Sequence, residues 1–368
     1  MRKVMFRGAI VAGIAALLLS LPTVAQISVG PGGVNFDQAA RVDPSSKNFH
    51  TNDGVITVAY VTHTAGNGFF NPAYIGATTA AQAFTAMGLP VNLLRLGPPD
   101  AADNIPATIA IIRQVLSDPK LDALAITTPQ VGAYSDIINR AFELGIPVAT
   151  FNSYDQTIPF RNQVSHTGQD ASAAAIGGDG IVKCLMDNNV RRGTVLFPNS
   201  TTLGNVEVNN RVVAAAKAVR DGLKKANLSD IRVDDGQGIG VDVRATTADA
   251  TQDIINLIQS TPNLVGIFGP NGSITPAVGN AVRITGKKDS VCSFGFDLGP
   301  AQLDLISTGD LDGSLGQQPY LQGFWPVAQL VLQIDRGVSA ANLDTRAEVV
   351  TRTNLTRFQQ IVRTRFTN

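Results

Sequence analysis

Short apolar runs recur along the chain from Gly54 onward, and segments with helical spacing of apolar residues separate most of them. In one such segment, four apolar residues between positions 105 and 116 fall on one face of a helix, which Asp103 or Asn104 is placed to cap. Apolar runs of five to seven residues that are each followed by such a helix are typical of a parallel sheet covered on both faces. The pattern therefore predicts an α/β fold. The runs are VITVAYV, VNLLRL, LDALAIT, IPVATF, GTVLF, LVGIF and VCSFGF.

This alternation of strand and helix takes place twice. The first series extends over residues 55–164, and the second begins with a helix at residues 171–186 and continues to about residue 316. A chain of 368 residues also exceeds what one hydrophobic core usually organises. We therefore predict two doubly wound parallel sheets, one in each of two lobes, with ligand-facing loops at the carboxyl ends of the strands.

The first 53 residues differ from the rest of the chain. Three basic residues precede an apolar stretch that ends in Thr-Val-Ala before Gln26, which predicts a secretory signal peptide over residues 1–25. The alternative is a membrane anchor, but the apolar stretch is short for a membrane span. Residues 26–53 have no sustained period and are predicted to form an extended arm. We expect an exported protein of the periplasm.

The charge of the exported chain argues against a polyanionic partner. Three of the 29 basic residues belong to the predicted signal peptide, so 26 remain against 29 acidic residues. A surface without a basic excess has no electrostatic preference for nucleic acid or anionic lipid. We therefore expect no nucleic-acid partner.

The two cysteines, Cys184 and Cys292, would meet an oxidising compartment after export. They could form a disulfide or remain two separate buried thiols. The sequence does not give the distance between them, so both interpretations stay open.

Polar and aromatic side chains gather where the predicted strands end. Amides and carboxylates bind vicinal hydroxyl groups, and an aromatic face packs on the C–H patch of a sugar ring. These residues therefore predict a cleft for a small hydroxylated ligand. They are His63, Asn67, Phe69, Phe70, Thr128, Gln130, Asn152, Ser153, Asp155, Asn271, Asp297, Gln317 and Gln318.

Several of these residues also have a purely structural interpretation. Phe69 and Phe70 could belong to the core at the start of a helix that Asn71 caps, and Asp297 could cap the helix that starts near Pro300. We expect at least one of the two rings to face the cleft. His63 and His166 lack neighbours with metal-ligand spacing, so neither is predicted to bind a metal, and His166 is left out of the site.

The order of these segments resembles the periplasmic sugar-binding proteins of the ribose and galactose type, the soluble receptors of ABC importers. The resemblance covers nearly the whole chain after Gly54. GFD followed by a Gly-Gln-x-Pro crossover is the more specific part of it. The matching segments are NGFFNPAYIGA, ITTP, GIPVATFNS, VSHTGQD, IFGPNG, FGFDLGP and GSLGQQP.

The resemblance implies a set of ligand-binding residues. In the second lobe, position 209 falls at the ligand position of its helix, whereas Arg211 lies at the edge of the next turn. An Asp-Arg pair of the family falls on Asn152 and Ser153, so the charge-assisted hydrogen bonds of that pair are absent and the bonding pattern differs. Thr128 stands where the ribose type has asparagine. The implied ligand-binding set is His63, Asn67, Phe69, Phe70, Thr128, Asn152, Ser153, Asn209, Asn271, Phe296, Asp297 and Gln317.

The resemblance also implies how the lobes are built and used. One lobe would comprise residues 54–167 plus 319–344, and the other residues 168–318 plus 345–368. Three crossovers near Gly168, Gln318 and Asp344 would form the hinge about which the lobes close. The expected ligand is a monosaccharide, with a sugar alcohol, a deoxy sugar or a furanose signal as alternatives. The expected partners are a membrane ABC permease and, as a further candidate, a chemoreceptor.

Enzyme activity is not expected. The chain has three histidines, no Gly-x-Ser-x-Gly motif and no P-loop, and its GQGIG segment follows a polar stretch and is interpreted as a turn. A secreted carbohydrate-active enzyme with a carboxylate pair is the remaining enzymatic alternative. We predict no cofactor and no metal.

Overall fold

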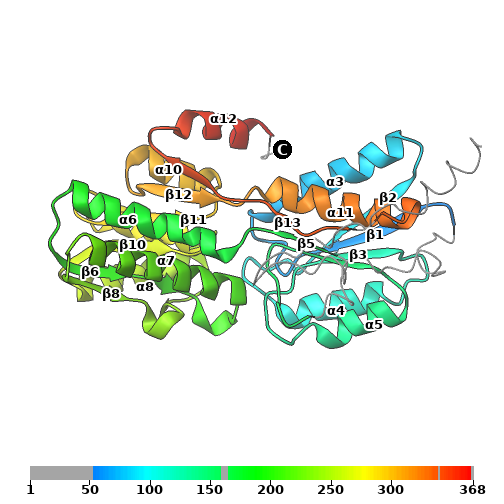
Figure 1. The fold of residues 1–368 in the computed structure, drawn as a ribbon, viewed down its shortest axis with the longest axis horizontal. Coiled ribbons are helices and arrows are strands. Elements are labelled where there is room, and N and C mark those ends of the chain that lie inside the picture. The colour runs from blue at the N-terminus through cyan, green and yellow to red at the C-terminus, as the bar shows by residue number, and fades with distance from the viewer. Residues whose placement is uncertain (1–52, 159–164, 339, 366–368) are drawn as a thin grey trace, which may run out of the picture. The chain divides into compact units, whose positions relative to one another are not determined.

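The computed structural model describes residues 53–158, 165–338 and 340–365 of the chain. Two six-stranded sheets organise these residues, each covered by helices on both faces (Figure 1). The predicted α/β fold with two parallel-dominated sheets is confirmed. The predicted signal peptide and all but the last residue of the predicted arm lie outside the described residues.

The first sheet, with strand order β13-β5-β4-β3-β1-β2, is parallel throughout. Val61 pairs with Leu96 on one side and with Ile126 on the other, so the carboxyl ends of three neighbouring strands lie level. The loops that follow them therefore meet at one edge of the sheet. The strands are β1 (Ile56–Val61), β2 (Val91–Leu96), β3 (Ala123–Ile126), β4 (Val148–Phe151), β5 (Ser165–Gly168) and β13 (Leu343–Asp344).

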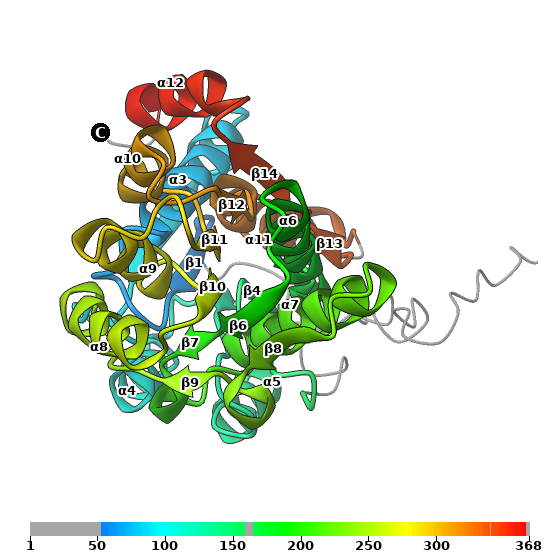
Figure 2. The same cartoon turned by 90° about the vertical axis from the view of Figure 1, so that its left-hand side faces the viewer.

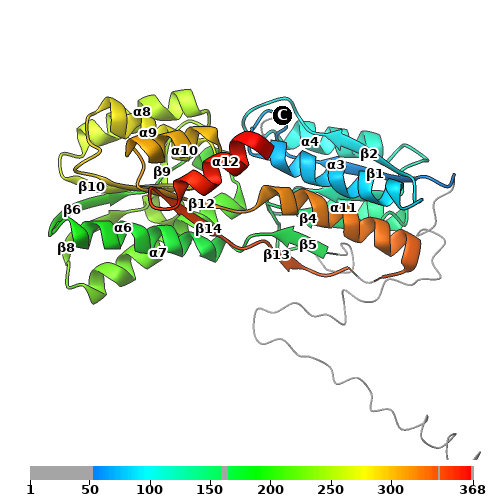
Figure 3. The same cartoon turned by 90° about the horizontal axis from the view of Figure 1, so that it is seen from above.

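Two pairs of helices cover this sheet. Helices α3 (Phe70–Ala86) and α11 (Pro319–Arg336) pack side by side on one face, and α4 (Ile105–Val115) and α5 (Ser135–Glu143) cover the other (Figures 1 and 3). The predicted helix near residues 105–116 is confirmed as α4. Its cap is Asn104, whose Oδ1 accepts a hydrogen bond of 3.1 Å from the Ala107 amide.

The contact between α3 and α11 requires two glycines. A Cβ at Gly76 would collide with the carbonyl oxygen of Tyr320, and a Cβ at Gly323 would collide with that of Ala73. The missing side chains let the two helix backbones approach closely. Helix α11, which comes late in the chain, thereby packs into the core of the first sheet.

The second sheet has the order β14-β12-β11-β10-β6-β8 and is parallel except for its antiparallel edge pair β12 and β14. Helices α6 and α7 cover one face, and α8, α9 and α10 cover the other (Figure 2). The strands are β6 (Arg192–Leu196), β8 (Asp230–Asp234), β10 (Leu264–Gly269), β11 (Cys292–Phe296), β12 (Gly313–Gly316) and β14 (Glu348–Thr351). The helices are α6 (Ala175–Asp187), α7 (Val206–Lys225), α8 (Thr247–Ser260), α9 (Ile274–Ile284), α10 (Pro300–Thr308) and α12 (Leu355–Arg365).

Short elements complete the second half of the chain. Strands β7 and β9 pair with each other beyond the end of β6, and the chain turns through three 3-10 helices. These elements are β7 (Pro198–Asn199), β9 (Val241–Asp242), η3 (Ala171–Ala174), η4 (Thr201–Leu203) and η5 (Gly236–Gly238).

The chain passes between the two sheets three times: after β5 ends at Gly168, after β12 ends at Gly316, and after β13 ends at Asp344. We call the first sheet with its helices the first lobe, and the second sheet with its helices the second lobe. Among the described helices, none is both long enough and apolar enough to cross a lipid bilayer.

Candidate functional site

Three strand-end residues adopt a backbone conformation that side chains rarely take. Asn152, Asp297 and Gln318 have φ angles of 59°, 75° and 52°. Such left-handed residues persist where the surrounding structure holds them, and they gather at functional sites. The Asn152 amide donates to the Thr167 carbonyl at 3.0 Å, and the Asp297 amide donates to the Leu315 carbonyl at 2.7 Å. These bonds fix where the chain leaves β4 and β11.

A cavity lies between the two lobes at these strand ends. Residues of the first lobe line one side, among them His63, Asn67 and Asn152, and residues of the second lobe such as Arg211 and Asp297 line the other. Its volume is about 50 Å³. A water molecule needs about 10 to 15 Å³ by this kind of measure, so the cavity has room for only a few waters. A larger guest can enter only after the lobes move apart.

A buried polar network forms the second-lobe wall of this cavity. The Gln317 side chain donates through Nε2 to Oδ1 of Asp297, and its Oε1 accepts a hydrogen bond of 3.1 Å from Nη2 of Arg211. The guanidinium of Arg211 lies 4.1 Å above the ring centre of Phe296. Burial raises the pKa of Asp297, although Arg211, Gln317 and the Gly272 amide favour its ionised form. The carboxylate and the guanidinium are thus joined through one amide.

This network continues into the first lobe. Nδ2 of Asn152 donates to Oε1 of Gln322 at 3.1 Å and lies 3.4 Å from Oε1 of Gln317. The Ser153 hydroxyl donates to Oδ1 of Asn152 at 3.2 Å. Gln322 is fully buried in α11, and nothing in the apolar pattern of the sequence distinguishes it from an ordinary helix residue. The two lobes therefore meet through amide side chains at the floor of the cavity.

Two asparagines that line the cavity use their side-chain oxygens within their own loops. Oδ1 of Asn67 accepts from the Phe69 amide at 3.0 Å, and Oδ1 of Asn271 accepts from the amides of Ser273 and Ile274 at 3.0 and 2.9 Å. Because each oxygen holds its own loop, the NH₂ group of each side chain is the part available to a ligand.

Polar atoms without partners occur in three lining residues. Nε of Arg211, Oδ1 of Asn199 and Oγ of Ser200 are buried and have no hydrogen-bond partner among the described residues. Buried polar groups are nearly always hydrogen-bonded, so unpaired ones call for an explanation. A polar guest between the lobes would supply the missing partners.

The mouth of the cavity is bridged between the lobes. Nδ2 of Asn205, the cap of α7, donates to Oδ2 of Asp103 at 2.8 Å, and the Val206 amide donates to the Pro129 carbonyl at 2.8 Å. Nε2 of His63 lies 3.4 Å from Oδ1 of Asp103. Burial opposes ionisation of Asp103, but His63 and the Asn205 bond outweigh it and hold its pKa below the usual value. An ionised Asp103 thus helps to hold the lobes together.

Three residues of the implied ligand-binding set lie outside the cavity lining, as do Gln130, Asp155 and Gln318 of the strand-end residues. The Thr128 hydroxyl accepts from the Asp155 amide at 2.9 Å and lies 3.4 Å from the Ser153 carbonyl, so it shapes the loop after β4. Phe296 lies beneath Arg211 and does not line the cavity. Oδ1 of Asn209 accepts from Nδ2 of Asn199 at 2.9 Å.

The register of α7 explains why Arg211, rather than Asn209, reaches the cavity. Residues 205, 208 and 211 line the cavity at intervals of three, the spacing of one helix face. Asn209 is rotated away from that face. The predicted ligand residue of this helix, Asn209, thus lies outside the cavity lining, and Arg211 lines it instead. The register of α7 could have been predicted from Asn205, because this capping residue marks where the helix starts.

The two adjacent phenylalanines have different environments. Phe70 begins α3, is 2% exposed and belongs to the core between α3 and the first sheet. Phe69 is half-buried and lines the cavity, and its ring meets that of Phe70 edge to face at 5.1 Å. The ring of His63 lies 5.2 Å from the other side of Phe70. Both residues line the cavity, but Phe69 offers the more exposed ring for stacking on a ligand, and Phe70 supports it from the core.

We expect alanine substitutions at these two positions to have different effects. Phe70→Ala should lower the free energy of unfolding by about 3 to 5 kcal/mol, because it removes a ring from the core. Phe69→Ala should mainly weaken ligand binding, by about tenfold, through the loss of ring stacking. Urea unfolding and calorimetry on both variants, with the exposed Phe142→Ala as control, measure the two effects. Negligible changes in both variants would contradict the assignment.

A buried carboxyl group lies beside the cavity at the start of α7. Burial raises the pKa of Glu207 to about 7, Arg211 opposes the shift, and Asp170 adds to it. Its Oε1 has no partner among the residues that the structure describes. Between its ordinary pKa of 4.5 and 7, the folded protein keeps a proton that the unfolded chain loses. Folding stability should therefore fall as the pH rises through this range.

Replacing this carboxyl group should remove that pH dependence. We expect Glu207→Gln to be more stable than wild type at pH 8, by on the order of 3 kcal/mol, and similar to it at pH 4.5. Urea unfolding across this pH range provides the measurement, with the exposed Glu143→Gln as the matched control. Parallel stability profiles for wild type and Glu207→Gln would show that Glu207 keeps an ordinary pKa.

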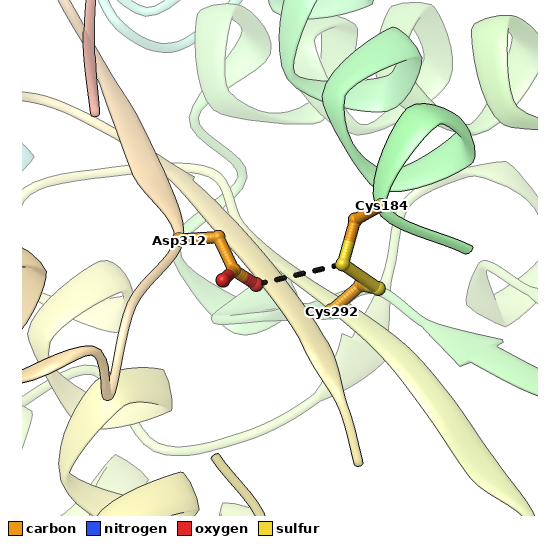
Figure 4. Close-up of side chains that lie close together, drawn as sticks. All are labelled: Cys184, Cys292 and Asp312. Atoms are coloured by element: carbon orange, nitrogen blue, oxygen red, sulfur yellow. Dashed lines mark hydrogen bonds between the residues drawn. A yellow bond between two sulfur atoms is a disulfide. The ribbon is translucent and has the colours of Figure 1, made fainter. Parts of the chain in front are cut away.

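One cluster in the described part of the chain has the spacing of a metal site, and a disulfide occupies it. Cys184 of α6 is bonded to Cys292 of β11, with a Cα–Cα distance of 5.9 Å, and Sγ of Cys184 lies 3.9 Å from Oδ2 of Asp312 (Figure 4). Sulfurs joined in a disulfide are not thiolate ligands. The structure thus pairs the two cysteines, and this cluster is a covalent link within the second lobe.

Two parallel sheets whose polar strand ends face one cavity, joined by three chain passages, define a two-lobed solute-binding protein. A family model described as periplasmic binding protein domain matches residues 58–337. The chain belongs to this family. The predicted resemblance to periplasmic binding proteins and the interpretation as a binding protein are confirmed.

Individual relatives agree with this assignment. The chain is similar to the xylose/arabinose-binding protein of Sulfolobus acidocaldarius, with 25% identity over 313 residues that cover 81% of this chain and 71% of the relative. An ABC transporter solute-binding protein of Burkholderia graminis, solved with D-arabinose, has 25% identity and a TM-score of 0.67 over 82% of this chain and 96% of its own. A solute-binding protein of Agrobacterium vitis, solved with D-fucose, shares the fold at 21% identity and a TM-score of 0.70, over 82% of this chain and 98% of its own.

Proposed function

We propose that the protein is exported to the periplasm, closes around one monosaccharide and delivers it to an ABC permease. The observation that carries this proposal is the set of unpaired buried atoms on Arg211, Asn199 and Ser200 around the cavity. A sugar offers several hydroxyl groups that both donate and accept, and each such bond contributes about 0.5 to 1.5 kcal/mol net. Its ring would pack on Phe69.

The bonding pattern favours a small sugar. Asn152 and Ser153 are neutral, so the first lobe offers neutral amide and hydroxyl groups in place of a charged pair. Two relatives that share 25% identity with this chain are described with xylose and arabinose, which are pentoses. We therefore place pentoses ahead of hexoses, deoxy sugars, sugar alcohols and furanose signals.

Binding by lobe closure follows from the geometry of the cavity. The cavity is too small for a sugar to enter as it stands, so the lobes must open about the three chain passages and close again over the guest. The Asp103–Asn205 bond at the mouth can form only when the lobes are close together. The closed form would be the one that the permease binds, and a chemoreceptor stays a further predicted partner.

A thermal-shift screen tests the proposed function. The panel contains D-xylose, D- and L-arabinose, D-fucose, D-galactose, D-ribose and the corresponding sugar alcohols. At a concentration 100 times its dissociation constant, a ligand stabilises the folded protein by about 2.7 kcal/mol, so a binding sugar should raise the melting temperature clearly. Small-angle scattering should show a smaller radius of gyration with that sugar. A panel in which no monosaccharide shifts the melting temperature would contradict the proposal.

A further inference from the structure

A second and larger pocket lies next to the cavity between the lobes. We call that cavity the sugar cavity. The second pocket has a volume of about 630 Å³, within the range of pockets that hold small molecules. It forms where the amino ends of α3, α10 and α11 come together, and α12 lines it as well; Figure 3 shows α12 extending from α10 toward α3. We call it the apolar groove. Its main apolar lining residues are Phe69, Pro72, Leu298, Tyr320, Phe358 and Ile361.

The apolar groove and the sugar cavity share a boundary. Asn67 and Phe69 of the first lobe and Gly272 and Asp297 of the second lobe line both. A Cβ at Gly272 would lie 3.2 Å from Oδ2 of Asp297 and 3.7 Å from Oδ1 of Asn67. The glycine therefore leaves open the space between these two side chains. A group attached to a sugar ring in the cavity could extend past Gly272 into the groove.

The two hollows differ in chemistry. The sugar cavity is lined mainly by amides, hydroxyls and the charged pair of Arg211 and Asp297, whereas hydrocarbon and aromatic side chains dominate the groove. Of the polar residues that line the groove, Asn71 and Arg357 are exposed to solvent. The buried ones already have partners within the protein: Asp297 accepts from Gln317, and Nε2 of Gln302 lies 3.5 Å from the Gly272 carbonyl. A second sugar in the groove would lose hydrogen bonds to water without gaining buried partners. An aryl or alkyl group has no such hydrogen bonds to lose, and its transfer from water into the groove is favourable.

We propose that the apolar groove is a subsite for the aryl or alkyl group of a glycoside whose sugar ring lies in the cavity. This inference rests on the proposed function and narrows its ligand class to sugars with an apolar substituent at one hydroxyl. Phe69 and Tyr320 belong to the first lobe, and Leu298 and Phe358 belong to the second. A group held between them contacts both lobes and favours the closed form.

Calorimetry with matched glycosides tests the proposal. The probes are the methyl and phenyl glycosides of D-xylose and D-arabinose in both anomeric forms, the two free sugars, and xylobiose as a sugar that carries a second sugar. We expect the phenyl glycoside of one anomer to bind at least tenfold more tightly than the methyl glycoside of the same anomer. Xylobiose should show no such gain.

Two tryptophan substitutions separate the groove from the rest of the surface. Ala301 is exposed, lies in the first turn of α10 and lines the groove without lining the sugar cavity. Ala301→Trp should fill the groove, abolish the preference for the phenyl glycoside and leave the affinity for the free sugar within about twofold of wild type. Ala110 is an exposed residue in the middle of α4, outside both hollows. Ala110→Trp should preserve the preference.

Three outcomes would overturn the proposal while leaving the proposed function in place. They are equal affinity of phenyl and methyl glycosides in the wild type, an equal gain for xylobiose, and an equal loss of free sugar and phenyl glycoside in Ala301→Trp. The last would mean that the groove serves lobe closure only. If no monosaccharide of the thermal-shift panel and no methyl glycoside binds, the proposed function itself fails and this inference falls with it.

Discussion

Asp297→Ala should lose at least a hundredfold in sugar affinity. The substitution removes the carboxylate that Gln317 contacts and leaves the guanidinium of Arg211 buried without its acidic neighbour. An unpaired buried charge costs about 3 to 5 kcal/mol, which corresponds to between a hundredfold and several thousandfold in affinity. Calorimetry with the sugar identified in the thermal-shift screen measures the effect.

Two further variants separate charge from backbone geometry. The φ angle of 75° at position 297 strains alanine but is tolerated by asparagine. Asp297→Asn therefore keeps the backbone and the shape of the side chain while it removes the charge, and it should lose a large part of the affinity without losing stability. Asp289→Ala, an exposed change in the same lobe, should bind like wild type. Unchanged affinity in Asp297→Ala would reject the assigned role of this carboxylate.

Removal of the disulfide should have a large effect on stability. Cys184 and Cys292 are separated by 108 positions in the sequence. Closing a loop of this length restricts the unfolded chain and can stabilise the folded state by up to about 4 to 5 kcal/mol. The double variant Cys184→Ser/Cys292→Ser should therefore melt on the order of 10 °C below the oxidised wild type. Thermal unfolding with and without a reducing agent measures this difference.

Sugar binding should survive the same change. Both cysteines belong to the second lobe, and neither lines the cavity or the apolar groove. The double variant should keep the wild-type affinity at a temperature where it is folded, and a reducing agent should not lower its melting temperature further. A melting temperature of the wild type that does not respond to reduction would indicate that the two thiols are not paired.

The apolar pattern of the sequence was sufficient for most of the fold. The seven apolar runs became β1, β2, β3, β4, β6, β10 and β11. Strands buried on both faces require continuous apolar sequence, as in β1, β3, β4 and β11, whereas the edge strand β2 is only partly buried. Strands β5, β12 and β13 lie at the chain passages between the sheets and contain at most one large apolar residue each, so hydrophobicity does not mark them. Edge strand β8, with its sequence DIRVD, is half exposed and carries charges.

Most of the residues predicted in the loops after strands line the cavity, as for Asn67, Phe69, Asn152 and Asp297, although Thr128 does not. Residues that a helix carries to the cavity were harder to predict, because a small error in the helix register exchanges one residue for another. Asn209 and Arg211 are only two positions apart in α7. Contacts between distant segments leave no local signal. The bond between Asp103 and Asn205 joins residues 102 positions apart, and the Gln322 partner of Asn152 lies 170 positions away.

The return of α11 to the first lobe has a consequence for how the chain is made. Five apolar residues of α11, between Val327 and Ile334, complete the core that α3 covers. A ribosome must therefore release nearly the whole chain before the lobe encoded first can finish folding. A fragment that stops before Pro319 would leave the apolar side of α3 uncovered and should aggregate, however complete its strands are.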